Sequence, residues 1–216
     1  MGVQPFNWSV VILGYWNVAI LSPGRIAEKI FGLEKGTKVP VMVSIDATIP
    51  CQVEHPNGDI RVLAGPNRLE FVLVKPNYDA LRHAMECAAK VLTWLPETPV
   101  HAAGFNVNHK TVDLSSEMVK LYAKDEIDHA LGELNREIDE RSIARTLKYE
   151  NGKVNLTFRG NADHFELLCN FHRDSKKNQE LIDWLSIPIH DIETYVTELL
   201  EKFGLRLEEP SNDDTE

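Results

Sequence analysis

The sequence has little cysteine and no long hydrophobic run. Its three cysteines, Cys51, Cys87 and Cys169, lie far apart without a CxxC spacing, which is typical of free thiols in a reducing compartment. No apolar stretch approaches the roughly 20 residues of a membrane-spanning helix. The opening residues, MGVQPFNWSVV, carry neither the basic segment nor the apolar core of a signal peptide. We therefore expect a cytoplasmic protein that does not bind a membrane.

Basic residues are also in deficit. Lys and Arg number 23 against 33 Asp and Glu, so the formal net charge is −10. Because contact with phosphate groups requires a basic surface, this balance predicts that nucleic acid is not a partner. An acidic protein can instead mimic nucleic acid toward a basic partner. We rank that alternative last, since charges of both signs are mixed along the chain.

The motifs of catalysis are missing as well. The chain has no GxSxG nucleophile elbow, no HExxH zinc motif, no phosphate-binding loop and no local pairing of cysteine with histidine. These absences favour a non-enzymatic protein, and they predict neither a cofactor nor a metal.

The most regular pattern lies in residues 57–95. Apolar and polar residues alternate in 60–64 and again in 69–73, as half-buried strands require, and Gly65-Pro66-Asn67 separates the two runs. Asn77 is a suitable N-cap for a helix that stops before Pro96. One face of this helix is apolar, with Tyr78, Leu81, Met85, Ala88, Ala89, Leu92 and Leu95 at spacings of three and four. The helix is the natural cover for the apolar face of the two strands.

A degraded copy of this unit begins at Asn151. Asn151-Gly152 matches Asn57-Gly58, and an Asn-Gly pair between alternating runs is the strongest short-range signal for a hairpin. Alternating residues in 154–158 and 165–171 then match the two strands, and a helical segment at 190–203 closes the copy. Two such units favour an internal duplication over convergence on a common meander.

These patterns predict an α+β protein with two related halves. Each half is a mostly antiparallel β-meander covered by an amphipathic helix, and further strands are expected at 8–21, 39–49 and 100–107. We expect an N-terminal half over 1–112, a connecting helix over 113–140, a C-terminal half over 141–207 and a disordered acidic tail over 208–216. One continuous domain is the alternative.

Over residues 8–205 this arrangement resembles a sporadically distributed family of uncharacterised bacterial proteins with two sheet-plus-helix halves. The resemblance lies in the architecture alone. Since that family has no established activity, the resemblance implies no functional residues.

The connecting helix contains one candidate for metal-dependent or acid–base catalysis. Asp125, Asp128 and His129 follow one another at helical spacing, so they can share a face and take His101 or His109 as a further ligand. They also lie opposite the apolar stripe of the helix, amid other charges, which is typical of a solvated acidic surface. A metal-dependent enzyme is therefore the second hypothesis.

The first hypothesis is a protein-binding or adaptor module. Asn106, Asn108 and Lys110 share one side of a predicted strand, where a row of amides could bind a ligand or peptide. The polar insertion SKKNQELIDWLS carries an apolar patch around Trp184, which we expect to be exposed and to contact a partner protein.

Overall fold

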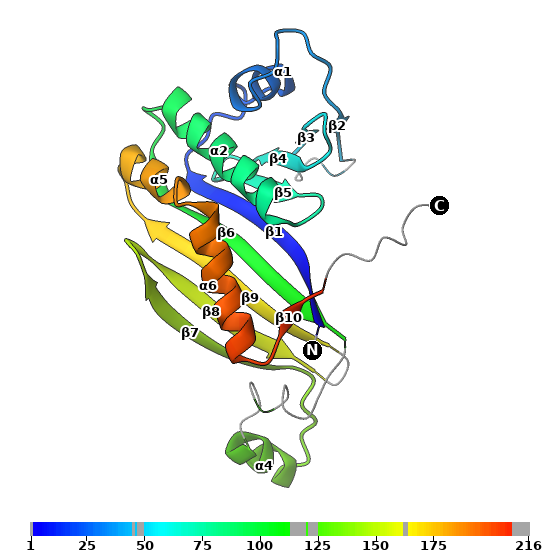
Figure 1. The fold of residues 1–216 in the computed structure, drawn as a ribbon. Coiled ribbons are helices and arrows are strands. Elements are labelled where there is room, and N and C mark those ends of the chain that lie inside the picture. The colour runs from blue at the N-terminus through cyan, green and yellow to red at the C-terminus, as the bar shows by residue number, and fades with distance from the viewer. Residues whose placement is uncertain are drawn as a thin grey trace.

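The computed structural model describes residues 2–44, 46, 50–112, 120, 125–161 and 164–208. Within these residues the chain forms one large sheet with helices against it, so the α+β class predicted from the sequence is confirmed (Figure 1). Nine strands follow the order β2-β3-β4-β5-β1-β6-β9-β8-β7, and all neighbours in this path are antiparallel. A tenth, β10 (Arg206–Leu207), pairs in parallel with the start of β1.

Two long strands form the middle of the sheet. β1 (Gly2–Gly14) pairs with β6 (Val100–Thr111) over most of its length, and the register shifts between Phe6 and Ser9, where Asn7 has a φ of 49°. On its other side β1 pairs with β5 (Arg68–Leu73), which continues through β4 (Ile60–Ala64), β3 (Gln52–Glu54) and β2 (Val41–Met42). The first half of the chain thus supplies the central strands and one wing.

The second half supplies the other wing. β9 (Phe165–Asp174) pairs with β6 from Ala102↔Asp174 to Thr111↔Phe165, and β8 (Gly152–Gly160) and β7 (Arg141–Tyr149) follow outward. Because β6 is hydrogen-bonded to both halves, the two meanders share a single sheet. The internal duplication is not confirmed, and the predicted domain boundaries remain predictions.

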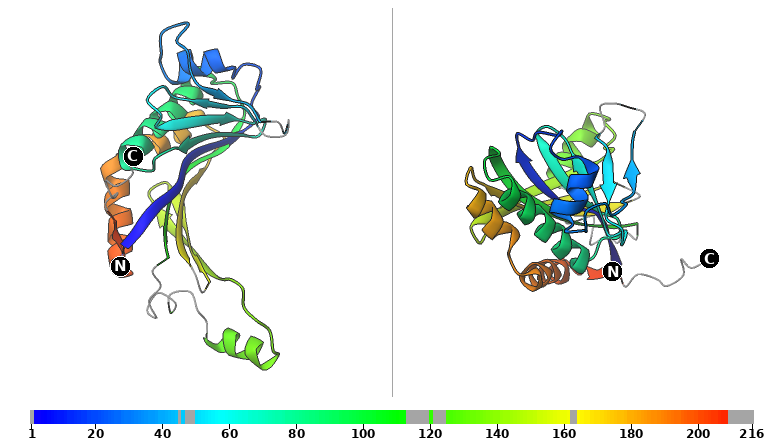
Figure 2. Two further views of the ribbon diagram at one scale, coloured as in Figure 1. Left: turned by 90° about the vertical axis from the view of Figure 1, so that its right-hand side faces the viewer. Right: turned by 90° about the horizontal axis from the view of Figure 1, so that it is seen from above.

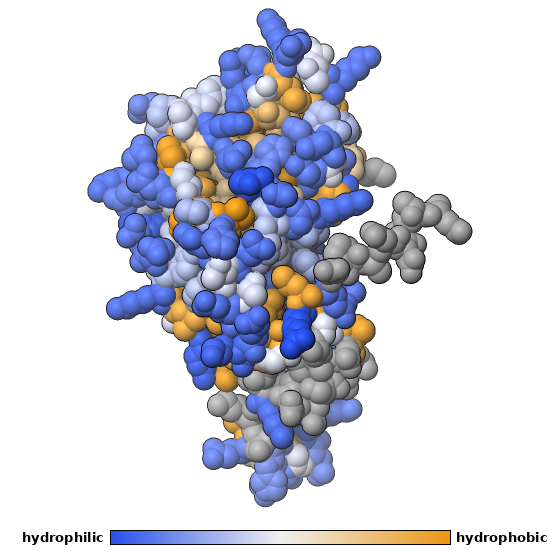
Figure 3. All heavy atoms as spheres, viewed as in Figure 1, coloured by the Kyte–Doolittle hydropathy of each residue, from blue (hydrophilic) through white to orange (hydrophobic). Residues whose placement is uncertain are grey.

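The helices pack on one side of this sheet. Figure 2, left panel, shows the sheet as a curved layer with α2 (Tyr78–Trp94), α5 (Asn178–Leu185) and α6 (Ile189–Lys202) on its convex side. The short α1 (Pro23–Arg25) and the π-helix η1 (Ile26–Ile30) lie beside α2. On this side Figure 3 shows mostly hydrophilic side chains at the surface, with hydrophobic ones in scattered patches. The apolar faces of helices and strands therefore meet in one core between them.

α2 begins where its sequence predicts. The Asn77 side chain accepts a hydrogen bond from the Ala80 backbone N–H at 2.8 Å, which satisfies one of the free amides of the first turn. We expect Asn77→Ala to lower the free energy of unfolding by about 1 kcal/mol, and Asn77→Ser, which keeps an acceptor, to cost much less. Urea denaturation of the two variants checks this, and equal losses would contradict the capping role.

Three expected elements are shorter than predicted. The strand expected over 8–21 ends at Gly14, and a turn follows at 18–20, where the Asn17 side chain accepts a hydrogen bond from Ala19 N–H at 3.2 Å. The strand expected over 39–49 contains only Val41 and Met42 as strand, and parts of it lie outside the described residues. The connecting helix is described as α4 (Asp125–Glu133), and residues 134–140 are not helical. The acidic tail lies outside the described residues beyond Glu208.

None of the helices in the described chain is both long and apolar enough to span a bilayer.

Candidate functional site

The helix candidate does not come together as a metal site in the residues that the structure describes. Asp128 accepts a hydrogen bond from the Arg141 side chain of β7 at 2.8 Å. His129 lies 3.2 Å from Glu133, and both side chains are more than two thirds exposed. The side chain of Asp125 lies outside the described residues. Asp128 therefore ties α4 to the sheet.

The two histidines considered as further ligands lie elsewhere. His101 is exposed at the start of β6, and its ring packs edge-on against Tyr15 with centroids 4.9 Å apart. His109 is fully buried in the core. Neither forms an ion pair or hydrogen bond with the described residues of α4.

His109 belongs to a buried group of ring side chains. Its imidazole packs edge-on against Trp8, 5.6 Å between centroids, and Trp8 packs in turn against Tyr78 at 5.0 Å. Neither ring nitrogen of His109 has a hydrogen-bond partner within the described chain. Burial lowers the pKa of His109 to about 4, because the charged imidazolium would lose its hydration there. The histidine is therefore held neutral and serves packing.

Trp184 is not exposed, which corrects the expectation from the sequence. Its side chain is 3% accessible, and its ring stacks on Phe105 with centroids 6.0 Å apart. The indole also lies against Gly152, where an added Cβ would come within 2.8 Å of the Trp184 ring. α5 is an amphipathic helix whose apolar residues, Leu181, Trp184 and Leu185, all face the core. The insertion contributes to the core and presents no apolar patch.

Asn106, Asn108 and Lys110 do share one side of β6, as predicted. They point away from the helices, while His109 and Val107 between them are buried against the core. We call this second side of the sheet the open face. None of the described helices packs on it (Figure 2).

A row of hydrogen-bonded amides crosses the open face. Thr146 of β7 donates to Asn155 of β8 at 3.0 Å, and Asn155 donates to Asn170 of β9 at 3.1 Å. Asn170 donates to Asn106 of β6 at 2.8 Å, and Asn106 donates to Ser9 of β1 at 3.0 Å. Successive members are directly opposite each other in the strand register. The sequence predicted an amide row along one strand, whereas the observed row runs across five.

Beside this row the open face is hollowed. A depression of about 170 Å³ lies over β6, where Ala102 and Gly104 have little or no side chain. Leu13 and Val11 of β1, with Arg68 and His172, form its walls. Gly104 is required here by close packing as well, because an added Cβ would lie 2.3 Å from the carbonyl oxygen of Phe171.

The helix side carries a larger groove of about 710 Å³ between α2 and the turn from α5 to α6. Apolar side chains, among them Met85, Trp94 and Ile187, line it together with the charged Lys29, Arg82, Glu86 and Lys90. The groove offers volume without a convergent set of polar groups.

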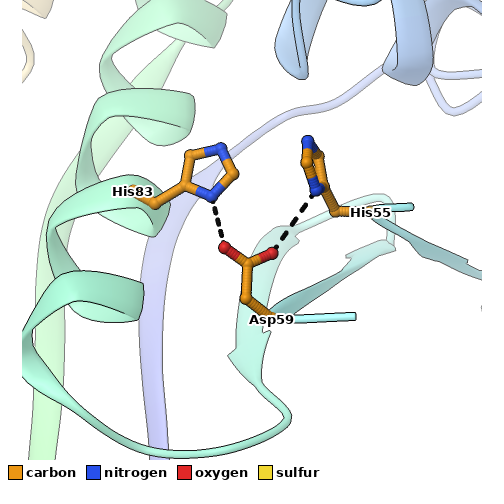
Figure 4. A group of neighbouring side chains, drawn as sticks. All are labelled: His55, Asp59 and His83. Atoms are coloured by element: carbon orange, nitrogen blue, oxygen red, sulfur yellow. Dashed lines mark hydrogen bonds and ion pairs between the residues drawn. The ribbon is translucent and has the colours of Figure 1, made fainter. Parts of the chain in front are cut away.

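A cluster of two histidines and one carboxylate lies near the N-terminal end of α2, and the sequence did not predict it. Asp59 accepts a hydrogen bond from His83 Nδ1 at 2.6 Å, and its second oxygen lies 3.5 Å from His55 Nδ1 (Figure 4). The two imidazole rings are perpendicular, with centroids 4.8 Å apart. All three side chains are partly exposed, between 13% and 25%.

Local structure places each member of this cluster. His55 and Asp59 flank the hairpin turn between β3 and β4, where Gly58 adopts a φ of 73° and its N–H bonds to the His55 carbonyl at 2.8 Å. His83 lies on α2, which covers this wing of the sheet. Burial alone would raise the pKa of Asp59, but the hydrogen bond and charge of His83, with Asn57, lower it below its usual value. The carboxylate is thus ionised between two imidazoles.

A signal for part of this cluster exists in the sequence. His55 and Asp59 bracket the same Asn57-Gly58 pair that predicts the hairpin, so their approach follows from the turn. His83 is distant in the sequence, and its approach depends on how α2 packs over the hairpin.

Comparisons with known proteins do not assign this chain to a family. No protein-family model and no curated protein matches the sequence. Among solved structures, the chain is similar to Methanococcus jannaschii TBP, with 7% identity and a TM-score of 0.29 over 94% of this chain and 99% of that chain. A TM-score of that size supports no conclusion on fold or function.

Proposed function

We propose that this protein is a non-enzymatic binding module whose open face binds the uncharged surface of a partner protein. The observation that carries the proposal is the uncharged strip across five strands, centred on the row Ser9, Asn106, Asn170, Asn155 and Thr146. In a protein whose residues are 26% charged, such a strip is a distinct surface.

The amide row has unused hydrogen-bonding capacity. A primary amide offers two N–H donors and two acceptor lone pairs. Each asparagine of the row donates one bond and accepts one within the row, so one donor and one acceptor remain on each. Bonding within the row also fixes the amide orientations, which lowers the entropy lost on binding. Main-chain amides and hydroxyls of a partner would match this pattern.

Several charges that lie beside the strip on the open face are paired with one another. Arg159 donates to Glu166 at 2.9 Å, and Lys153 donates to Asp174 at 2.8 Å. On the other wing Arg68 pairs with Glu70 at 2.8 Å. Protein interfaces are depleted of charged residues at their centre and have a polar rim, which this arrangement resembles. A nucleic acid would instead require unpaired basic groups.

The depression gives the open face a hollow into which a partner side chain could fit. Leu13, 36% exposed, and Val11 stand beside it, so a partner side chain inserted over Gly104 would contact apolar groups. Insertion of one apolar side chain into such a hollow is how many interfaces gain most of their affinity.

We expect Leu13→Glu to weaken partner binding by roughly tenfold or more while the fold persists, because it replaces an apolar wall of the depression with a charged side chain. Val18→Glu is the matched control, since Val18 is 41% exposed and lies in the turn after β1. The wild-type protein is used to capture its partner from an extract of the native cell. Calorimetry with the purified partner then compares the variants.

Two outcomes would overturn the proposal. Equal affinity of wild type and Leu13→Glu for the partner would place the binding surface elsewhere. Failure to find any stoichiometric protein partner would remove the function itself.

A further inference from the structure

We propose that His55, Asp59 and His83 form a binding site for a divalent transition-metal cation. This site is independent of the open face and goes beyond the binding function proposed above. Two imidazole nitrogens and one carboxylate oxygen are a ligand set suited to Zn²⁺ and related first-row ions.

The spacing of the ligand atoms fits one ion. One ligand atom from each residue lies within 4.8 Å of the other two, and this is the single such group of three found in the described chain. A tetrahedral ion with bonds near 2.0–2.1 Å holds its ligand atoms roughly 3.3 Å apart. His83 Nδ1 lies 2.6 Å from Oδ2 of Asp59, and His55 Nδ1 lies 3.5 Å from Oδ1, so each histidine is close to that value from one carboxylate oxygen. Side-chain rotations that bring both nitrogens toward the same ion would complete the site.

One oxygen of Asp59 is left without a hydrogen bond. Oδ1 is buried, and no described residue donates to it, although His55 Nδ1 is 3.5 Å away. A buried carboxylate oxygen without a donor is costly, and a bound cation would remove that cost. Together with the two imidazole nitrogens, this oxygen is positioned to bind a cation.

The surroundings hold the ligands in place. The His55 ring packs edge-on against Phe31, with centroids 4.8 Å apart, and its Nδ1 lies 2.5 Å from the Asn57 side-chain oxygen. Asn57 also accepts a bond from the Asp59 backbone N–H at 3.2 Å. The Phe31 contact and the bond to the Asp59 backbone orient the two side chains. Asn57 Oδ1 contacts the same His55 nitrogen that faces Asp59, so an ion bound to that nitrogen would displace this contact. Figure 4 shows the two rings on either side of the carboxylate, one from the hairpin and one from α2.

Three protein ligands leave at least one coordination position open. A structural Zn²⁺ site usually has four protein ligands, whereas an open position admits water or another small ligand. The partial exposure of all three side chains gives an ion a path from solvent. The site would therefore exchange its metal and hold a water molecule on it.

The first test is titration of the metal-free full-length protein with Zn²⁺, Co²⁺ and Mg²⁺. We expect one equivalent of Zn²⁺ to bind by calorimetry and to raise the melting temperature, because a ligand that binds only the folded state stabilises it. Co²⁺ should bind at the same site and give visible absorption bands. Mg²⁺, which prefers oxygen ligands, should have no effect.

The second test uses variants at the cluster. His83→Gln and Asp59→Asn should each weaken Zn²⁺ binding by roughly tenfold or more. His172→Gln is the matched control, because His172 also contacts a carboxylate, Asp174, at 2.7 Å but has no second histidine there. Circular dichroism of each variant checks the fold. If one of the two cluster variants unfolds, the other can still be measured. Lack of Zn²⁺ binding by the wild type, or equal binding by the cluster variants, would overturn the proposal.

Discussion

Replacement of Trp184 by alanine is expected to lower the free energy of unfolding by about 3–5 kcal/mol, the cost of removing a large aromatic from a core. Its ring is almost completely buried and packs on Phe105, Tyr149 and the backbone of Gly152. A small domain has a free energy of unfolding of roughly 5–15 kcal/mol, so this single change removes a large part of the stability. Urea denaturation followed by circular dichroism measures the loss.

Tyr15 provides the comparison. It is also aromatic, but 63% of its side chain is exposed, so Tyr15→Ala should change the stability by less than about 1 kcal/mol. If Trp184→Ala were no more destabilising than Tyr15→Ala, the packing of α5 against the sheet would be contradicted.

A second large effect is expected from pH. Because burial lowers the pKa of His109 to about 4, the folded state resists protonation that the unfolded chain undergoes near pH 6.5. Stability from this group is complete above pH 6.5 and is lost as the pH falls toward 4. The loss amounts to roughly 3 kcal/mol, since one pKa unit corresponds to about 1.4 kcal/mol.

His109→Leu should abolish that part of the acid sensitivity. Leucine keeps an apolar side chain in the same place and removes two ring nitrogens without partners in the described chain, so stability at pH 7 should equal or exceed that of the wild type. Denaturation of both proteins at several pH values between 7 and 4.5 gives the difference. His129→Gln, a change at an exposed histidine, should keep the full loss. Parallel curves for wild type and His109→Leu would show that His109 is not responsible.

The elements that the sequence predicted well are those fixed by near neighbours. The alternation in β4 and β5 and the Asn77 cap of α2 depend on residues within one turn or one strand. The joining of both wings through β6 depends on pairing between distant segments, which local patterns do not contain. For this reason the local patterns predict the α+β class correctly but do not predict that both meanders share one sheet.

The site residues also divide into those that local sequence patterns predict and those that depend on contacts between distant segments. The side of β6 that carries Asn106 and Asn108 follows from strand periodicity, but the amide row also needs Asn155 and Asn170 in register from another wing. Trp184 was wrongly assigned to the surface because polar residues surround it in the sequence. The spacing of Leu181, Trp184 and Leu185 is nevertheless that of a buried helix face, so the sequence does contain a signal for their burial.

The position of β1 has a consequence for how the chain folds during synthesis. This strand is synthesised before its partners β5, β6 and β10, which follow later along the chain. Sheets built from contacts this distant in sequence fold slowly, because each loop must close before its pairing is gained. Until β6 has emerged, at least one edge of β1 stays available to other chains, which favours aggregation of nascent molecules. Expression at low temperature, or with chaperones that shield exposed strands, should therefore raise the yield of folded protein.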